Sequence, residues 1–294
     1  MLSIFFDVEA AFDKVWHAGL IYKLAKLKTP HYILRFFIVF LSNRSIKVKV
    51  GASYSDEIAC TCGVPQGACV SPTLYSIYGN DAPKRLTKND EMTLLFADDS
   101  EYSLLFKKKS KRIEKKAQKF VNELEAWSKK WRSTLATHKC NYIVFSKSNK
   151  KENFSLILNN DTIPRCNSIK YLGLTLDERL NFNEHIMNLR IECRDRLSAL
   201  KIVAHKSWRL SKETLKQIYH SIVRSKIEYS FILVGCLGSG VWEKLRVIQN
   251  NALRIIYGKK REFGNAQLHE LSGEISLEER LIELKPRYLK KSNS

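Results

Sequence analysis

The 294-residue chain has few of the features that mark a membrane, secreted or zinc-binding protein. It contains no apolar run long enough to cross a bilayer. Its N-terminus has no basic segment ahead of an apolar one, which argues against a secretory signal. The seven cysteines are scattered and odd in number, with no Cys-x-x-Cys pair and no two histidines at zinc spacing. We therefore expect reduced thiols in an intracellular protein.

Acidic residues are also scarce relative to basic ones. The chain has 30 Asp and Glu against 50 Lys and Arg, a net charge of +20, and 44% hydrophobic residues, typical of a globular protein. Such an excess indicates a polyanionic partner, most simply nucleic acid, with a membrane surface as the alternative. Internal repeats and low-complexity linkers are absent from the sequence.

The strongest local signal is a pair of adjacent aspartates between two short apolar runs. Thr93 to Ala97 and Tyr102 to Phe106 are joined by Asp98-Asp99-Ser100-Glu101, which predicts a β-hairpin with both carboxylates at its tip. Neighbouring side chains of a regular strand point to opposite faces, so only a turn brings both aspartates to one site. Ordinary turn chemistry is the alternative explanation for this pair.

A third apolar run, Leu2 to Phe6, ends at Asp7. If this run pairs beside the hairpin, Asp7 meets Asp98 across the edge of the sheet. Carboxylates that close repel each other and favour a shared proton or a divalent cation. Three acidic oxygen donors suit Mg²⁺, which binds through a few carboxylates plus substrate phosphates. The pattern therefore predicts a site for metal-assisted nucleotidyl transfer.

Helical periodicity is expected in three segments of the first 140 residues. These segments are 10–27, 32–41 and a long amphipathic helix with its buried face from Ile113 to Trp131. Trp127 and Trp131 are expected to be core residues. Eight basic residues lie between positions 107 and 119. A solvated face is the default for such a run, and phosphate contact is the alternative.

Strand and turn signals fill the rest of the first 180 residues. We expect a basic hairpin over 46–59, a strand over 142–146, a hairpin turning at 159–161, and a strand over 171–176. The sequence Gly63-Val64-Pro65-Gln66-Gly67 predicts a defined turn. Ser71 is expected to cap the next helix, with Pro72 at its first position. The turn beside a helix N-terminus suits a phosphate, and a turn without any ligand is equally expected.

Beyond Arg179 the strand patterns stop and helices are expected over 186–203, 215–229 and 241–257. This change in pattern predicts an α+β domain over residues 1–180 and an all-helical region over residues 181–294.

Three sequence motifs follow one another in the chain. They are Phe6-Asp7-Val8-Glu9-Ala10-Ala11-Phe12-Asp13-Lys14-Val15-Trp16-His17, Gly63-Val64-Pro65-Gln66-Gly67 and Phe96-Ala97-Asp98-Asp99. Together they resemble the core motifs of the reverse transcriptases of non-LTR retrotransposons, especially the jockey-like group of arthropods. Further segments are similar to that group: Leu41-Ser42-Asn43-Arg44, Trp131-Arg132, Lys139, Tyr171-Leu172-Gly173 and Leu277-Glu278-Glu279-Arg280. The resemblance covers nearly the whole chain.

The resemblance implies a right-hand polymerase palm with a small antiparallel sheet and packed helices, followed by a helical thumb and C-terminal region. It implies that Asp7, Asp98 and Asp99 are catalytic and bind Mg²⁺ or Mn²⁺, and that Lys139 protonates the pyrophosphate leaving group. The implied activity is RNA-directed synthesis of DNA from dNTPs. The implied partners are an RNA template and a DNA primer, or their hybrid, with no membrane.

The resemblance also implies roles in substrate binding. The Val8 carbonyl would face the metal, and the Phe12 ring would exclude a ribose 2′-hydroxyl. Gln66 and Gly67 would line the nucleotide and template. Tyr171, Leu172 and Gly173 would form the primer grip. Target-primed insertion of an element into a genome requires access to the nucleus. The protein is therefore expected in the nucleus, or in a cytoplasmic ribonucleoprotein.

The chain departs from the family at its start, almost at the first motif, so we expect an N-terminally truncated fragment without the fingers and endonuclease domains. Ala68 and Ser100 replace a common serine and threonine. A catalytically inactive remnant that binds RNA or RNA–DNA hybrid through its basic surface is the alternative function. A metal-dependent nuclease fits the carboxylates but not the Gly63–Gly67 turn or Phe12.

Overall fold

The computed structural model describes residues 1–85, 90–148, 152–231 and 239–291. The chain forms two compact units, residues 1–167 and 168–294. The assignment of a palm to residues 1–180 and a thumb to residues 181–294 stays a prediction. None of the helices in the described part of the chain combines the length and apolar character that a bilayer crossing requires. The six cysteines described there are all free.

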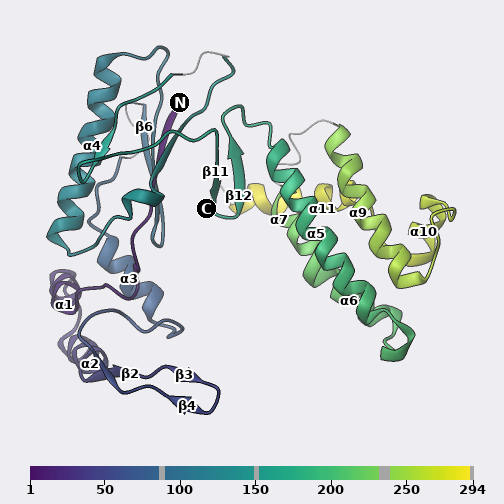
Figure 1. The fold of residues 1–294 in the computed structure, drawn as a ribbon, viewed down its shortest axis with the longest axis horizontal. Helices are drawn as coiled ribbons and strands as arrows, with labels where there is room; N and C mark the ends of the chain where they lie inside the picture. Colours follow the sequence, from purple (N-terminus) through teal and green to yellow (C-terminus); the bar gives the residue numbers. More distant parts are fainter. Residues whose placement is uncertain (86–89, 149–151, 232–238, 292–294) are drawn as a thin grey trace. The chain divides into compact units, whose positions relative to one another are not determined.

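The first unit is built on a four-stranded antiparallel sheet with the strand order β6-β7-β1-β8 (Figure 1). The strands are β1 (Leu2–Phe6), β6 (Glu91–Phe96), β7 (Asp99–Leu104) and β8 (Asn141–Val144). β1 is buried along its whole length and apolar except for Ser3, whose hydroxyl bonds the Ser103 hydroxyl of β7, so it suits a central position. The predicted α+β class with a small antiparallel sheet is confirmed.

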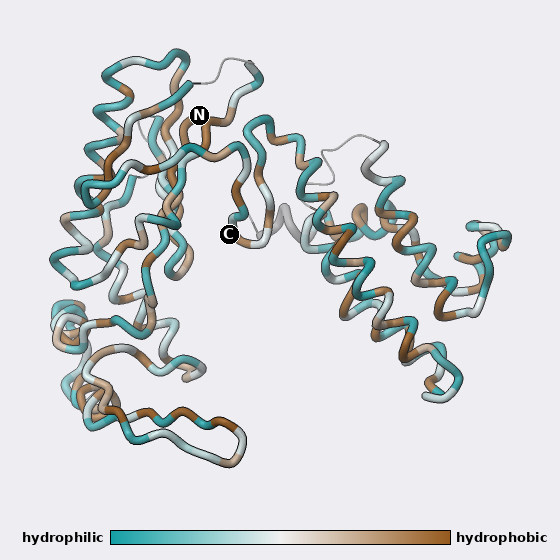
Figure 2. Tube along the Cα trace, in the orientation of Figure 1, coloured by the Kyte–Doolittle hydropathy of each residue, from teal (hydrophilic) through white to brown (hydrophobic). Residues whose placement is uncertain are grey.

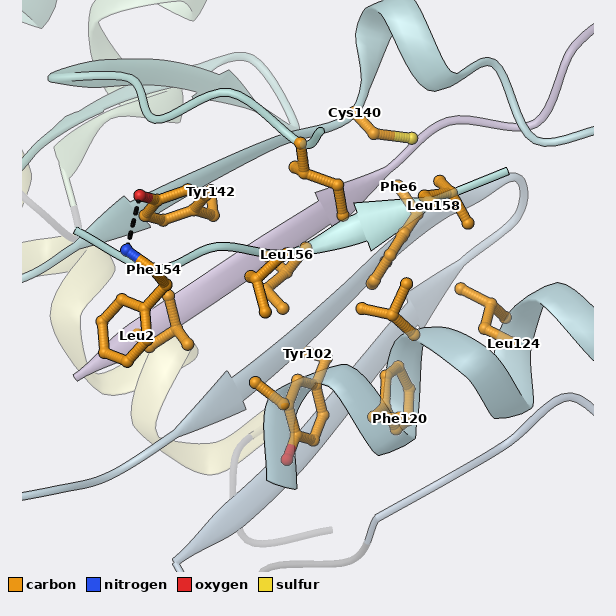
Figure 3. Packing of buried hydrophobic residues seen from close by; sticks show 14 of the residues in the cluster. Leu2, Phe6, Tyr102, Phe120, Leu124, Cys140, Tyr142, Phe154, Leu156 and Leu158 are labelled. Atoms are coloured by element: carbon orange, nitrogen blue, oxygen red, sulfur yellow. Dashed lines mark hydrogen bonds between the residues drawn. The ribbon is translucent and has the colours of Figure 1, made fainter. Parts of the chain in front are cut away.

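Helix α4 (Lys111–Lys130) covers one face of this sheet. The Ser110 side chain caps it by accepting a hydrogen bond from the Ile113 amide. The Tyr102 and Phe120 rings stack with centroids 4.0 Å apart, and Phe6 and Leu124 join the same cluster (Figure 3). The predicted buried face of α4 is confirmed. Trp131 is 5% exposed and Trp127 packs against the core, so both are core residues as expected.

The β6–β7 hairpin is tighter than predicted. Phe96 pairs with Asp99, so the turn consists of Ala97 and Asp98 alone. Ala97 has a φ of 52°, in the left-handed region that a two-residue hairpin turn needs. Asp99 is therefore the first residue of β7, not part of a four-residue tip.

A second cluster of the first unit holds α1 (His17–Lys26), α2 (His31–Leu41) and α3 (Ser71–Gly79). The predicted start of the first helix at Ala10 was wrong. Residues 9–14 form turns, with Ala10 at a φ of 48°, and the helix begins only at His17. Ser71 is the first helical residue, not the cap, because its hydroxyl donates to the Pro65 carbonyl 2.5 Å away.

Short ribbons complete the first unit. The basic hairpin is confirmed, but it splits into the pair β2 (Arg44–Ile46) with β5 (Ile58–Cys60) and the pair β3 (Lys49–Val50) with β4 (Ser53–Tyr54). Figure 2 shows apolar residues alternating with polar ones along its first strand. The 159–161 hairpin is confirmed as β9 (Ile157–Leu158) and β10 (Asp161–Thr162). A 3₁₀ turn, η1 (Thr137–Lys139), precedes β8. The strand predicted over 142–146 is confirmed as β8, with its ends shifted by one or two residues.

The second unit begins with a hairpin where a single strand over 171–176 was predicted. β11 (Ser168–Tyr171) and β12 (Leu174–Asp177) pair across a turn at Leu172-Gly173. Helices follow: α5 (Asn183–Val203), η2 (Lys206–Trp208), α6 (Lys212–Tyr219), η3 (His220–Arg224), α7 (Ser225–Tyr229), α9 (Ser239–Tyr257), α10 (Asn265–Ser272) and α11 (Leu277–Lys291). The three predicted helices are confirmed, but a π-helical turn, η3, interrupts the second.

Candidate active site

The acidic motifs meet at one end of the four-stranded sheet, along the edge where β1 ends and β7 begins. Strand β1 runs antiparallel to β7, with Ile4 opposite Tyr102 and Phe6 opposite Ser100. The next position along this ladder is Asp7 on one side and Asp99 on the other. Asp98 lies in the adjoining turn. The predicted pairing of β1 beside the hairpin is confirmed, although the register puts Asp99 rather than Asp98 across from Asp7.

The charges of Asp98 and Asp7 act on the Asp99 carboxylate. Partial burial raises the pKa of Asp99 above its ordinary value, and the negative charges of Asp98 and Asp7 raise it further. A carboxylate cluster of this kind is stabilised by any cation that neutralises it. The arrangement is therefore an electronegative edge that favours a positively charged ligand.

The Asp7 carboxylate has a buried oxygen whose partner is the Lys139 ammonium. Its Oδ2 atom is buried and accepts no hydrogen bond, and the Lys139 ammonium lies 3.2 Å away. Backbone hydrogen bonds hold this lysine nearby, because the Ala136 amide donates to the Asp7 carbonyl and the Glu9 amide donates to the Thr134 carbonyl. Lys139 is half-exposed, so its ammonium can turn toward a bound anion.

No preformed metal cage exists in the described residues, since no three His, Cys, Asp or Glu side chains there are grouped to hold an ion. Mg²⁺ does not require one. It is usually held by one or two carboxylates, waters and substrate phosphates. The Asp7 oxygen that pairs with Lys139, and the negative charges of Asp98 and Asp7 beside Asp99, fit a site that substrate completes.

The Gly63–Gly67 turn is fastened to the first motif. The Gly63 amide donates to the Val15 carbonyl and the Val64 amide to the Phe12 carbonyl, each at 2.8 Å. The Gly63 carbonyl accepts from His17 Nε2 at 2.7 Å and from an Arg44 guanidinium nitrogen at 2.9 Å. The structure thus joins two motifs that lie about 50 residues apart in the sequence.

At the far end of this turn, Gln66 donates to both carboxylate oxygens of Asp13 at 3.0 Å. Gly67 has a φ of +86°, and a Cβ atom at this position would meet nothing within 4 Å. Open space next to a backbone in this conformation leaves room for a ligand to approach.

Gly63→Ala is expected to destabilise the first unit more than Gly67→Ala. Both residues have a φ of +86°, but a Cβ on Gly63 would lie 2.6 Å from the Asp13 carbonyl oxygen. Conformational strain alone costs about 1–2 kcal/mol, and the clash should bring the loss for Gly63→Ala to about 3 kcal/mol or more. Urea unfolding of both variants measures the difference, and equal losses would contradict this explanation.

Phe12 and Val8 reach the same edge from the first motif. The Phe12 ring stacks on Tyr75 of α3 with centroids 4.8 Å apart. Tyr75, Val8 and Asp98 line a pocket of about 200 Å³. Burial and the nearby Asp98 and Asp7 raise the pKa of Tyr75, so its hydroxyl stays neutral. Sequence reasoning missed Tyr75, because its spacing on α3 is that of an ordinary core residue.

Tyr171, Leu172 and Gly173 belong to the second unit and form the tip of its hairpin. Leu172 and Gly173 have φ values of 46° and 79°, as a tight turn requires. The Tyr229 hydroxyl donates to the Leu172 carbonyl at 2.6 Å. Tyr229 was also missed, since it follows Leu172 by 57 residues and lies in a helix without a motif.

The chain is similar to known reverse transcriptases over most of its length. The profile of the reverse transcriptase (RNA-dependent DNA polymerase) family matches residues 2–176. The RNA-directed DNA polymerase from mobile element jockey of Drosophila melanogaster is 31% identical over 263 residues, 87% of this chain and 28% of that protein. The probable RNA-directed DNA polymerase from transposon X-element of the same species is 27% identical over 271 residues, 91% of this chain and 29% of that protein.

A solved structure of apo telomerase from Candida tropicalis is also similar, with a TM-score of 0.45 and 14% identity over 87% of this chain and 45% of that one. The chain spans less than a third of the length of the curated relatives it matches. The resemblance to polymerases of non-LTR elements is confirmed by these relatives. Because the family profile matches more than half of this chain, the chain belongs to the reverse transcriptase (RNA-dependent DNA polymerase) family.

Proposed function

We propose that this chain carries the catalytic edge of an RNA-directed DNA polymerase, which adds dNTPs to the 3′-hydroxyl of a primer paired with an RNA template. The observation that carries the proposal is the convergence of Asp7, Asp98 and Asp99 at one sheet edge from segments about 90 residues apart. Residues 1–180 would act as the palm and residues 181–294 as the thumb and C-terminal region. The working location would be the nucleus or a ribonucleoprotein.

The proposed cofactor is Mg²⁺, or Mn²⁺, held by the aspartates. The bridge between Val8 and Leu135 uses the backbone groups of Asp7 and Glu9, which leaves the Val8 carbonyl outside that bridge as a further oxygen donor. Bound divalent cations would activate the primer hydroxyl and neutralise charge on the triphosphate. The carboxylates would fix the position of these charges before the substrate arrives.

The first two motifs would shape the nucleotide site. Phe12, fixed by its stack on Tyr75, would close the space that a ribose 2′-hydroxyl needs and so favour dNTPs. Gln66 and Gly67 would line the nucleotide and template, where Gly67 leaves open space. In the second unit, Tyr171, Leu172 and Gly173 would hold the primer, with the turn supported by Tyr229.

Lys139→Gln is expected to lower kcat for nucleotide addition about 100-fold, the usual minimum for loss of a general acid. The Lys139 ammonium pairs with Asp7 in this structure and would donate a proton to the departing pyrophosphate during the reaction. The KM for dNTP should change little. Lys26→Gln, on the exposed end of α1, is the matched control. A rise in KM with unchanged kcat would assign Lys139 to binding instead.

Primer extension tests the proposal as a whole. Purified chain, Mg²⁺ and dNTPs are combined with a DNA primer on an RNA template, and again with rNTPs in place of dNTPs. The proposal predicts extension that requires Mg²⁺ and prefers dNTPs. Tight binding of the hybrid without any extension would favour the alternative, a catalytically inactive remnant of the same family.

A further inference from the structure

The start of α4 and the segment before it carry a positive cluster that no role above uses. Residues 107–119 contain eight basic side chains and a single acidic one, Glu114. Six of the eight are exposed and make no hydrogen bond or ion pair with the described part of the chain. We call these six the basic cluster: Lys107, Lys108, Lys111, Arg112, Lys115 and Lys119.

The neighbouring charges do not neutralise the basic cluster. Glu114 accepts a hydrogen bond from the Ser155 amide at 2.5 Å. Lys116 pairs with Glu91 at 3.5 Å, and Lys109 lies over the Phe154 ring. These two cations are therefore engaged in the fold, whereas the six of the basic cluster are not.

The basic cluster opposes the stability of its own helix. Basic residues in the first turns meet the positive end of the helix dipole, where acidic residues are preferred. Lys111 and Lys115, and Lys115 and Lys119, are like charges four residues apart on one helix, which repel. Figure 2 shows α4 as largely hydrophilic. Positive charges that destabilise their own helix indicate that the cluster binds a polyanion outside the chain.

The basic cluster starts at the end of the sheet opposite the aspartates. Strand β7 leads from Asp99 to Leu104, and the five steps between them span roughly 17 Å. The cluster begins three residues further on, and α4 then returns so that Leu124 lines the pocket beside Asp98. Lys107, Lys108 and Lys111 therefore lie at the opposite end of β7 from the aspartates and outside the proposed active site.

The chemistry of this surface suits a nucleic-acid backbone better than a membrane. The apolar face of α4 is buried, with Ala117 and Val121 fully covered, so the exposed face has nothing to insert into lipid. Lysines without exposed aromatic neighbours contact phosphates and do not read bases. We propose that the basic cluster binds the phosphate backbone of the RNA template outside the active site, as a second anchor. The choice of RNA rests on the proposed function.

The test replaces all six residues of the basic cluster with glutamine in the full chain. A control variant carries the same change at six exposed lysines scattered over both units: Lys26, Lys28, Lys201, Lys206, Lys259 and Lys260. Fluorescence anisotropy with single-stranded RNA is measured over a range of salt concentrations. The cluster variant should bind about tenfold more weakly or worse. The slope of the logarithm of the binding constant against the logarithm of the salt concentration should become less steep by about 4. The control variant should lose much less.

Stability and activity separate this proposal from the proposed function. The cluster variant should unfold at an unchanged or higher temperature, because repulsion has been removed. Its extension of a short hairpin template-primer should match wild type, whereas extension on a long RNA should fall. The binding assay involves no chemistry, so an inactive wild type would leave it valid. Equal losses of RNA binding in both six-fold variants, or preferential loss of binding to phosphatidylserine vesicles, would overturn the proposal.

Discussion

Asp98→Asn is expected to reduce primer extension about 10²–10³-fold, on the order of the loss when one preorganised charge-stabilising group is removed. The substitution keeps the size of the side chain and removes one negative charge from the turn between β6 and β7. Divalent cations would then be held weakly, and the primer hydroxyl would stay protonated. Steady-state extension at saturating dNTP on an RNA template measures the effect.

The control for this loss is Asp56→Asn, which makes the same change in an exposed ribbon of the first unit. It should extend primers like wild type. Asp98→Asn should also let the pKa of Asp99 fall, since the Asp98 charge is one of the causes that raise it. The variant should still bind RNA–DNA hybrid. If Asp98→Asn extends as well as Asp56→Asn, the assignment of this carboxylate is wrong.

Phe120→Ala is expected to lower the free energy of unfolding by about 3–5 kcal/mol, the usual cost of truncating a buried aromatic side chain. Phe120 is 2% exposed, stacks on Tyr102, and lies 6.1 Å from Phe6 between ring centroids. Such a loss is a large part of the total stability of a typical domain, about 5–15 kcal/mol. Urea denaturation measures it.

This prediction also concerns activity, because Phe120 packs against the two strands that lead to the aspartates (Figure 3). Phe120→Ala should therefore lose extension activity at a lower temperature than wild type. Tyr32→Ala, an aromatic truncation on α2 at a side chain that is 74% exposed, is the control and should stay within about 0.5 kcal/mol. Equal stability of the two variants would show that α4 does not anchor this face of the sheet.

The sequence predicts the pairing of the strands that carry the three aspartates, because the signals for these strands are local. The apolar run before Asp7 and the runs around Asp98 each announce a strand, and a central strand must find neighbours on both sides. The exact register is not local. It depends on the two-residue turn at Ala97-Asp98. This turn is hard to predict because Ala97, which is not a glycine, adopts a positive φ. The position opposite Asp7 was therefore assigned to Asp98 instead of Asp99.

The misplaced elements have similar causes. Apolar spacing continues from the turns at residues 9–14 into α1, so periodicity alone placed the helix start at Ala10. The hairpin at Leu172-Gly173 was read as one strand, because Leu172 at a φ of 46° is not a typical turn residue. Tyr75, Tyr229 and the Asp7–Lys139 pair join segments that are distant in sequence. Only the folded structure brings them together.

The most direct test of the central claim asks whether Asp7, Asp98 and Asp99 hold one divalent-cation site. Fe²⁺ replaces Mg²⁺ in the presence of template-primer and dNTP, and hydroxyl radicals generated at the iron cut the chain beside it. The account predicts cuts near residue 7 and near residues 98–99 together, both competed by Mg²⁺ and both lost in Asp98→Asn. Cuts at only one of these segments, or cuts that persist in the variant, would contradict a shared site.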